Sequence, residues 1–321
     1  MSQPILTVIG ATGTQGSSVV DAALAAGIYH VRAITRNTTS DKAASLRSRG
    51  AEVVSADLNN ESSLIAAFVG SSAIYAVTDF FEPFAKAGPE EGMKVEVQQG
   101  KNLANAATKT PTLKHYIWST LPNGFEISGG KYLVPHFEAK CKIDAYIKTI
   151  PDLYAKTTFL WITWYATNYA FPMFTPIFVP TSGKYLQICT GPATTPILSI
   201  GDAKSNVGLF TNAILAQPEL TYTRYILAYM EETTMGEMFK TWGRAVGKEV
   251  AYVQVNDVGE FDNVWPNWGR EMGVMMELWG EYGNKSWTGQ DVLTTKDLGL
   301  TGGFVGIEEA FRKQGLSGLG L

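Results

Sequence analysis

Short apolar runs alternate with stretches of helical periodicity along the first half of the chain. A short, mostly apolar run is typical of a strand covered on both faces, and strands that alternate with helices indicate a parallel sheet. The predicted strands are residues 5–9, 30–35, 51–58, 72–78, 115–120 and 157–162. The predicted helices are residues 17–26, 41–49, 60–68, 93–108 and 135–149, with a loop over residues 79–92.

The alternation weakens after residue 160, where segments rich in Trp, Tyr, Phe and Pro replace it. Helical patterns return at residues 203–216 and 234–246, and a strand-like run follows at 249–255. We therefore predict an α/β fold with a doubly wound parallel sheet in residues 1–160, to which later segments contribute. Residues 161–321 are predicted to form a smaller, mixed lobe that folds over the crevice and binds the substrate.

The first strand ends in three glycines spaced three apart, in the run Ile5-Leu-Thr-Val-Ile-Gly10-Ala-Thr-Gly13-Thr-Gln-Gly16. A strand that turns at once into a helix presents free backbone N–H groups and the positive helix end to a pyrophosphate. Gly10 permits the turn, Gly13 lets the backbone approach phosphates, and Gly16 lets helix and strand pack closely. This context favours a Rossmann-type dinucleotide site over an ordinary glycine-rich turn. The candidate contacts in the turn are Gly10, Thr12, Gly13, Thr14, Gln15 and Gly16.

The end of the second strand indicates which dinucleotide is bound. NAD sites usually carry Asp or Glu there, but this strand ends Thr35-Arg36-Asn37, with no acid before Asp41. The planar guanidinium of Arg36 suits a 2′-phosphate, and Lys42 adds a second positive charge. NADP(H) is therefore favoured over NAD(H). The alternative is that Arg36 is a solvated charge at the strand end.

Polar residues also end the other strands of the predicted sheet. In open parallel sheets the ligand lies outside the carboxyl ends of the strands. Asp57, Thr78, Ser119 and Thr120 all fall at such ends. Hydroxyls at strand ends also cap turns, so a catalytic role for Ser119 or Thr120 and a structural one both stay open.

Composition excludes several classes of protein. The 321 residues are 45% hydrophobic and 17% charged, and the formal net charge of −4 gives no basic footprint for nucleic acid. Two cysteines, Cys141 and Cys189, are too few for a disulfide framework or a zinc site. Asn168, Pro172 and Pro176 interrupt the most apolar segment, residues 159–179, which argues against a membrane span. With no signal peptide recognised, we expect a cytoplasmic protein without a metal.

Several stretches together carry a family resemblance. The matching stretches are residues 10–16, 31–36, 56–58, 115–120, 135–140, 165–168 and 235–255. They resemble the NmrA-like members of the atypical short-chain dehydrogenases/reductases. The resemblance implies that NADP(H) is bound by Gly13, Gln15, Gly16, Arg36, Asp57, Leu58, Thr78 and Lys140. It also places Tyr165 and Asn168 beside the nicotinamide, and we add Asp79, next to Thr78, to the predicted contacts.

The catalytic motif departs from that of ordinary short-chain reductases. Their Tyr-x-x-x-Lys reads His136-Phe-Glu-Ala-Lys140 here, so the lysine is kept and the tyrosine is replaced. Histidine exchanges protons near neutral pH, so chemistry remains available to it. A structural role for His136 at the start of the helix is an equal alternative. The catalytic candidates are Lys140, His136, Ser119 and Thr120.

Aromatic residues near the expected crevice suggest a flat, largely apolar ligand, although core packing explains some of them. They are Phe80, Phe81, Phe84, Trp118, Tyr132, Trp161, Trp164, Tyr165 and Tyr169. Four later tryptophans are predicted either to close a lid over the site or to form a contact between subunits. They are Trp265, Trp268, Trp279 and Trp287. We therefore predict an NADPH-dependent reductase of a small or medium, cyclic or aromatic acceptor, acting in a biosynthetic pathway. The alternatives are a redox sensor that acts through a protein partner and a cofactor-retaining isomerase or cyclase. A homo-oligomer also stays open.

Overall fold

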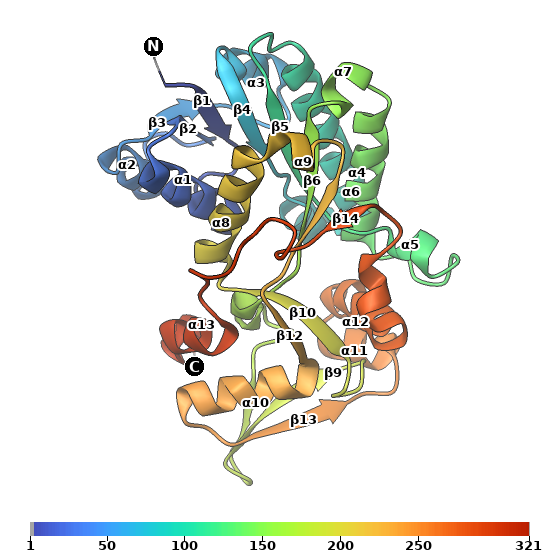
Figure 1. Ribbon diagram of the computed structural model, residues 1–321. Helices are drawn as coiled ribbons and strands as arrows, with labels where there is room; N and C mark the ends of the chain where they lie inside the picture. The colour runs from blue at the N-terminus through green and yellow to red at the C-terminus, as the bar shows by residue number, and fades with distance from the viewer. Residues whose placement is uncertain (1–2, 321) are drawn as a thin grey trace.

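An eight-stranded parallel sheet forms the centre of the computed structural model, which describes residues 3–320 (Figure 1). The strand order is β14-β11-β6-β5-β4-β1-β2-β3. The strands are β1 (Ile5–Val8), β2 (His30–Thr35), β3 (Glu52–Ser55), β4 (Ser71–Ala76), β5 (His115–Thr120), β6 (Thr157–Ile162), β11 (Tyr225–Ala228) and β14 (Val292–Leu293). Each neighbouring pair in this sheet is parallel. The predicted Rossmann-type α/β fold is confirmed.

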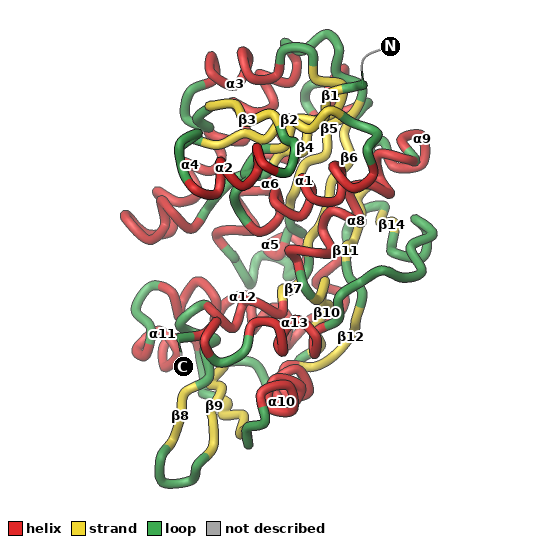
Figure 2. The backbone as a smooth tube through the Cα atoms, turned by 90° about the vertical axis from the view of Figure 1, so that its left-hand side faces the viewer, coloured by secondary structure: helices red, strands yellow, loops and turns green. Residues whose placement is uncertain are grey.

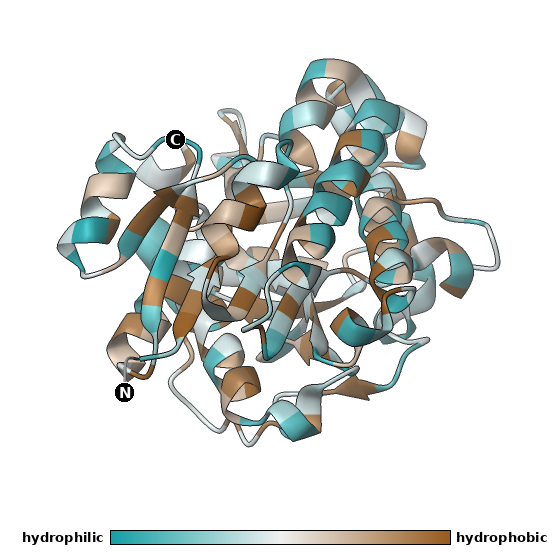
Figure 3. Ribbon diagram, turned by 90° about the horizontal axis from the view of Figure 1, so that it is seen from above, coloured by the Kyte–Doolittle hydropathy of each residue, from teal (hydrophilic) through white to brown (hydrophobic). Residues whose placement is uncertain are grey.

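Helices cover both faces of this sheet. One face carries α1 (Thr14–Ala26), α2 (Asp41–Ser48) and α8 (Ala203–Ala216), and the other carries α3 (Glu61–Phe68), α4 (Phe81–Thr108) and α6 (Pro135–Lys148). Successive strand residues therefore enter different cores. Ile117 packs in the cluster of α1 and α8, whereas Trp118 packs in the cluster of α4 and α6. Apolar residues recur along the strands, and the surrounding helices carry many hydrophilic residues (Figure 3).

Two small sheets and several helices build the smaller, C-terminal lobe, which lies below the central sheet in Figure 2. The first sheet contains β7 (Trp164–Tyr165), β10 (Pro196–Gly201) and β12 (Glu231–Thr234). The second contains β8 (Ile177–Val179), β9 (Lys184–Cys189) and β13 (Val250–Gln254). The helices are η1 (Ala166–Ala170), α10 (Met235–Val246), α11 (Val258–Val264), α12 (Trp268–Tyr282), η2 (Gly283–Trp287), α13 (Ile307–Gln314) and η3 (Ser317–Leu319). The remaining short helices are α5 (Gly124–Ile127), α7 (Pro151–Tyr154) and α9 (Pro218–Thr221).

After residue 160 the chain returns to the central sheet. Strand β11 pairs with β6, β14 pairs with β11, and α8 packs against α1. Helix α8 approaches α1 so closely that a Cβ at Gly208 would lie 2.3 Å from the carbonyl oxygen of Ser18. The chain thus crosses between the sheet and the smaller lobe more than once, and the two-domain division at residue 160 stays a prediction.

The prediction of a loop over residues 79–92 is wrong, because most of this segment is helical. Helix α4 begins at Phe81, and the carboxylate of Asp79 caps this start by accepting a hydrogen bond from the Phe81 N–H at 3.0 Å. Gly88, with a φ of +84°, then kinks the helix immediately before Pro89. Glycine and proline in this segment therefore mark a kink between two helical pieces, not a loop. No helix within residues 3–320 combines the length and apolar character of a membrane span.

Candidate functional site

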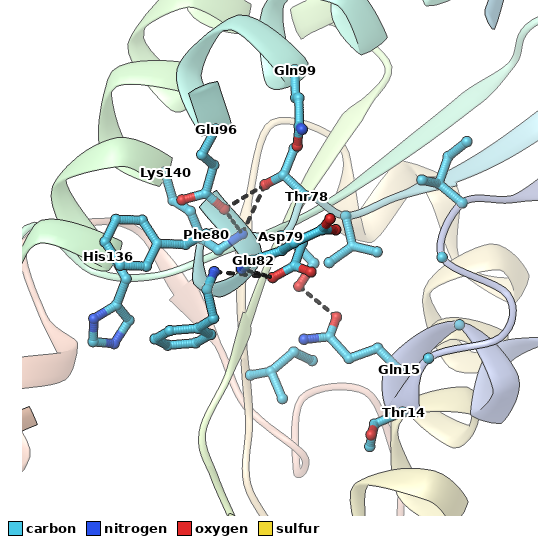
Figure 4. A pocket seen from close by; sticks show the side chains of 18 of the residues that line it. Thr14, Gln15, Thr78, Asp79, Phe80, Glu82, Glu96, Gln99, His136 and Lys140 are labelled. Carbon is cyan, nitrogen blue, oxygen red and sulfur yellow. Dashed lines mark hydrogen bonds and ion pairs between the residues drawn. The ribbon is translucent and has the colours of Figure 1, made fainter. Parts of the chain in front are cut away.

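A cavity of about 790 Å³ opens at the carboxyl ends of the strands, and part of it is shown in Figure 4. Its walls come from the turn after β1, from the ends of β2, β4 and β5, and from α4 and α6. Segments of the smaller lobe complete it, namely β7, η1, α12 and η2. The predicted placement of a ligand at the carboxyl edge of the sheet thus coincides with this cavity.

The glycine turn forms one end of this cavity. Gly10 has a φ of +64°, which glycine adopts without strain. A Cβ at Gly16 would lie 2.2 Å from the carbonyl oxygen of Gly10, so only glycine fits there. Helix α1 begins at Thr14 after Gly13, which has no side chain to cap the first N–H groups. This cradle fits the pyrophosphate of a dinucleotide, since it offers free N–H donors, the positive helix end and space beside Gly13.

Gln15 joins three strands at the middle of the cavity. Its Oε1 accepts hydrogen bonds from Tyr75 Oη at 2.7 Å and from Ser119 Oγ at 2.8 Å. Its Nε2 donates to Tyr165 Oη at 2.5 Å. Burial raises the pKa of Tyr165 to about 12, so this phenol is protonated at neutral pH. Ser119 and Tyr165 are therefore brought together, although they lie on β5 and β7.

Lys140 and Thr78 meet a buried carboxylate that the sequence did not reveal. Lys140 Nζ lies 3.0 Å from Glu96 Oε1 and donates to Thr78 Oγ1 at 3.1 Å (Figure 4). Thr78 Oγ1 in turn donates to Glu96 Oε1 at 2.7 Å. The ammonium also lies over the Trp118 ring, 5.2 Å from its centroid. Glu96 thus neutralises and holds the lysine, so Lys140 is a fixed donor and not an unpaired positive charge.

His136 pairs with Glu271 across the two parts of the molecule. Its Nδ1 lies 2.5 Å from Glu271 Oε1, and its backbone N–H donates to the same oxygen at 3.1 Å. The side chains are 8% and 1% exposed, respectively. The carboxylate therefore orients the imidazole and also accepts from a backbone N–H in the first turn of α6. Nε2 has no protein partner in the described chain, and His136 lines the cavity.

Thr120 differs from its neighbour Ser119, because its hydroxyl belongs to the core. It donates to Asp144 Oδ1 at 2.7 Å, as does Trp118 Nε1 at 2.8 Å. Tyr225 Oη donates to the second oxygen at 3.1 Å. Burial raises the pKa of Asp144 to about 7 despite these three donors. Thr120 therefore ties β5 to α6 through Asp144, and it also lines the cavity.

The predicted adenosine end gathers Arg36, Lys42, Asp57 and Asp79 around the glycine turn. Arg36 Nη1 lies 2.9 Å from Glu82 Oε2. Asp57 Oδ1 accepts hydrogen bonds from the backbone and side-chain N–H groups of Asn59. The other predicted contacts that line the cavity are Thr12, Thr14, Leu58, Thr78 and Asn168. The structure thus brings all of the predicted cofactor contacts to one cavity.

The aromatic residues divide between the cavity and the core. Those that line the cavity are Phe80, Phe81, Trp164, Tyr165, Trp279 and Trp287, joined by Phe137, Phe171 and Phe174, which the sequence analysis did not list. Those outside its lining are Phe84, Trp118, Tyr132, Trp161, Tyr169, Trp265 and Trp268. Met272 and Met275 of α12 complete the apolar wall. The wall of this end of the cavity is therefore largely aromatic and aliphatic.

Comparison with known proteins identifies the family of the chain. The model of the NmrA-like family matches residues 2–310. The chain belongs to the NmrA-like family. It is 30% identical to the NmrA-like family domain-containing oxidoreductase FrzB of a Cladobotryum species, over 78% of this chain and 76% of that protein. It is 28% identical to the oxidoreductase cpsB of Aspergillus campestris, over 79% of this chain and 76% of that protein.

Solved structures of NmrA-like proteins share the fold. NmrA, described as a negative transcriptional regulator, aligns with a TM-score of 0.80 at 22% identity and covers 100% of this chain and 99% of its own. The Citrobacter triphenylmethane reductase complexed with NADP(H) aligns with a TM-score of 0.68 at 20% identity, over 96% of this chain and 99% of its own. The family thus includes proteins named as oxidoreductases and one named as a regulator.

Glu96, Glu271 and Tyr75 are among the residues of this NmrA-like chain that the sequence analysis did not identify. Glu96 and Glu271 are buried carboxylates on helices, and Tyr75 lies within β4. The only signal for Glu96 was an acid on the apolar side of the helical pattern at residues 93–108. Glu271 lies 135 positions from His136, and no local pattern connects them.

Proposed function

We propose that this NmrA-like protein is an NADP(H)-dependent oxidoreductase that reduces a flat, largely apolar acceptor. One observation carries the proposal. A single cavity joins a glycine cradle for a pyrophosphate to the His136–Glu271 pair under aromatic walls. The names of relatives such as FrzB agree with an oxidoreductase, and the NADP complexes of NmrA and of triphenylmethane reductase agree with the cofactor. A protein that only sensed the cofactor would not need the second half of the cavity.

The residues of the glycine turn would hold the pyrophosphate, and Arg36 with Lys42 would take the 2′-phosphate. When bound, the nicotinamide supplies the hydride. Lys140, fixed by Glu96 and Thr78, would donate to the adjoining ribose. Because Glu96 balances its charge, its main contribution is orientation.

His136 is the best placed group to exchange a proton with the acceptor. Glu271 takes the Nδ1 side, so the Nε2 atom is the one that acts in the cavity. The other hydroxyls are less suitable. Ser119 donates to Gln15, Thr120 donates to Asp144, and burial raises the pKa of Tyr165. Phe81, whose ring centroid lies 5.4 Å from that of His136, helps to exclude water from this point.

A panel of quinones, enones, ketones and imines tests the proposal by the oxidation of NADPH. We expect turnover of at least one planar apolar acceptor and none of small polar ones. Tight binding of NADPH without turnover of any acceptor would contradict the proposal and favour a cofactor-responsive regulator.

A further inference from the structure

A carboxylate of the protein already contacts Arg36, the residue proposed to bind the 2′-phosphate. Glu82 Oε2 lies 2.9 Å from Arg36 Nη1, and its Oε1 accepts from Lys86 Nζ at 2.9 Å. All three residues line the same cavity as the glycine turn, and Glu82 is labelled in Figure 4. Lys86 and Arg36 hold the pKa of the Glu82 carboxyl below its ordinary range, so it is ionised at neutral pH.

The backbone around Glu82 is fixed near Arg36. Asp79 Oδ1 accepts from the Phe81 N–H at 3.0 Å and from the Glu82 N–H at 3.4 Å, which anchors the first turn of α4. The approach of Glu82 to Arg36 therefore follows from the turn between β4 and α4. The side chains of Arg36 and Glu82 are nevertheless 65% and 38% exposed, so a ligand can reach the pair and separate it.

The two cofactors would meet this carboxylate differently. A 2′-phosphate carries a charge of about −2 and would have to displace or repel Glu82 in order to use Arg36. The ribose of NAD(H) has a hydroxyl at that position. This hydroxyl can donate a hydrogen bond to a carboxylate, as it does to the acid at the end of the second strand in NAD sites. Strand β2 has no such acid, but Glu82 brings one to the same place from α4.

We propose that Glu82 is a cofactor-discriminating residue. It competes with the 2′-phosphate for Arg36 and offers its carboxylate to the ribose of NAD(H). It therefore holds the preference for NADP(H) below the value that Arg36 alone would give. This inference rests on the proposed binding of a nicotinamide dinucleotide.

Glu82→Gln tests the inference in calorimetric titrations with NADP⁺ and NAD⁺. The amide keeps the size of the side chain and removes its charge. We expect the affinity for NADP⁺ to rise by about three- to tenfold and that for NAD⁺ to stay equal or fall. The gain should shrink as salt is added, because the charges are exposed. Glu91→Gln is the matched control, since Glu91 lies on the same helix, pairs with Lys94 and does not line the cavity.

A second probe isolates the phosphate. The affinity for adenosine 2′,5′-bisphosphate should rise in Glu82→Gln as that for NADP⁺ does, whereas the affinity for 5′-AMP should not. An unchanged ratio of NADP⁺ to NAD⁺ affinity, or an equal change for both, would overturn the role of Glu82. Failure of the wild type to bind either dinucleotide would instead contradict the proposed function itself, so the two failures are distinguishable.

Discussion

The two ends of the cavity are built in different ways. The proposed phosphate end is local, because the glycine turn would supply most of its donors from seven consecutive residues, 10–16. The proposed acceptor end is assembled from distant segments, with His136 on α6, Glu271 on α12 and Trp164 on β7. A local site survives wherever its strand, turn and helix form, whereas an assembled site depends on the packing of the smaller lobe. Substitutions at the two ends should therefore separate binding from turnover.

Gly13→Val should have the largest effect, and this effect should be confined to cofactor binding at the proposed phosphate end. Gly13 has an ordinary φ of −92°, but its Cβ would lie 3.3 Å from Gly10 O, so the turn must shift by a few tenths of an ångström and thermal unfolding should be measured beside binding. The branched side chain would occupy the path of the pyrophosphate, and NADPH binding should fall at least about a hundredfold by calorimetry. Gly16→Ala is the contrasting variant, because its Cβ would collide with the backbone of Gly10 and lower stability. Normal NADPH binding by Gly13→Val would show that the turn holds no phosphate.

Lys140→Ala should lower the rate of NADPH oxidation by about 10²-fold, because the adjoining ribose loses the donor that orients it, and should also destabilise the fold. The second effect follows because Glu96, which is fully buried, loses its ion-pair partner. The double variant Glu96→Gln/Lys140→Met removes both charges, so it should recover the thermal stability but not the rate. Recovery of the rate in the double variant would show that the lysine has no part in turnover.

Arg36→Ala should reduce the affinity for NADP(H) by roughly ten- to a hundredfold, as expected for the loss of one charge-assisted contact to phosphate. The affinity for NAD(H) should change little. Titration of both cofactors against wild type and variant measures the difference. Equal losses for the two cofactors would place Arg36 outside the 2′-phosphate site.

Asp144→Asn should give the smallest effect, on the pH dependence of stability. The pKa of Asp144 is raised from 3.8 to about 7 in the fold, so the folded state binds more protons and stability falls as pH rises across this interval. His115 acts in the opposite sense, because burial lowers its pKa from 6.5 to about 4 and stability rises with pH there. The two slopes offset each other between about pH 4 and 6.5.

Chemical unfolding at several pH values checks this prediction. Removing Asp144 should steepen the rise of stability with pH by up to about 1 kcal/mol per pH unit. The pH profile of turnover should stay as in the wild type, since Asp144 belongs to the core with Thr120. A shifted turnover profile in Asp144→Asn would mean that this core carboxyl takes part in the chemistry.

The same contrast explains what the sequence could predict. Strands β5 and β6 were predicted to the residue, and the glycine turn was located, because apolar runs and glycine spacing are local signals. The start of α4 was missed because its cap, Asp79, and its kink at Gly88 look like loop residues. Glu271 was missed because its partner lies far away in the chain, and only the folded lobe brings the two together. The predicted site residues and their roles stay predictions until variants are measured.

The Glu271→Gln variant tests the central claim most directly, since it alters the assembled end of the cavity and leaves the phosphate end intact. Its Kd for NADPH and its kcat with the best acceptor should be measured together, beside those of His136→Phe. The account predicts an unchanged Kd, a kcat reduced by about tenfold or more for Glu271→Gln, and a loss of about 10² or more with an altered pH profile for His136→Phe. An unchanged kcat in both variants, at normal stability, would contradict the assignment of His136 and Glu271 to the chemistry.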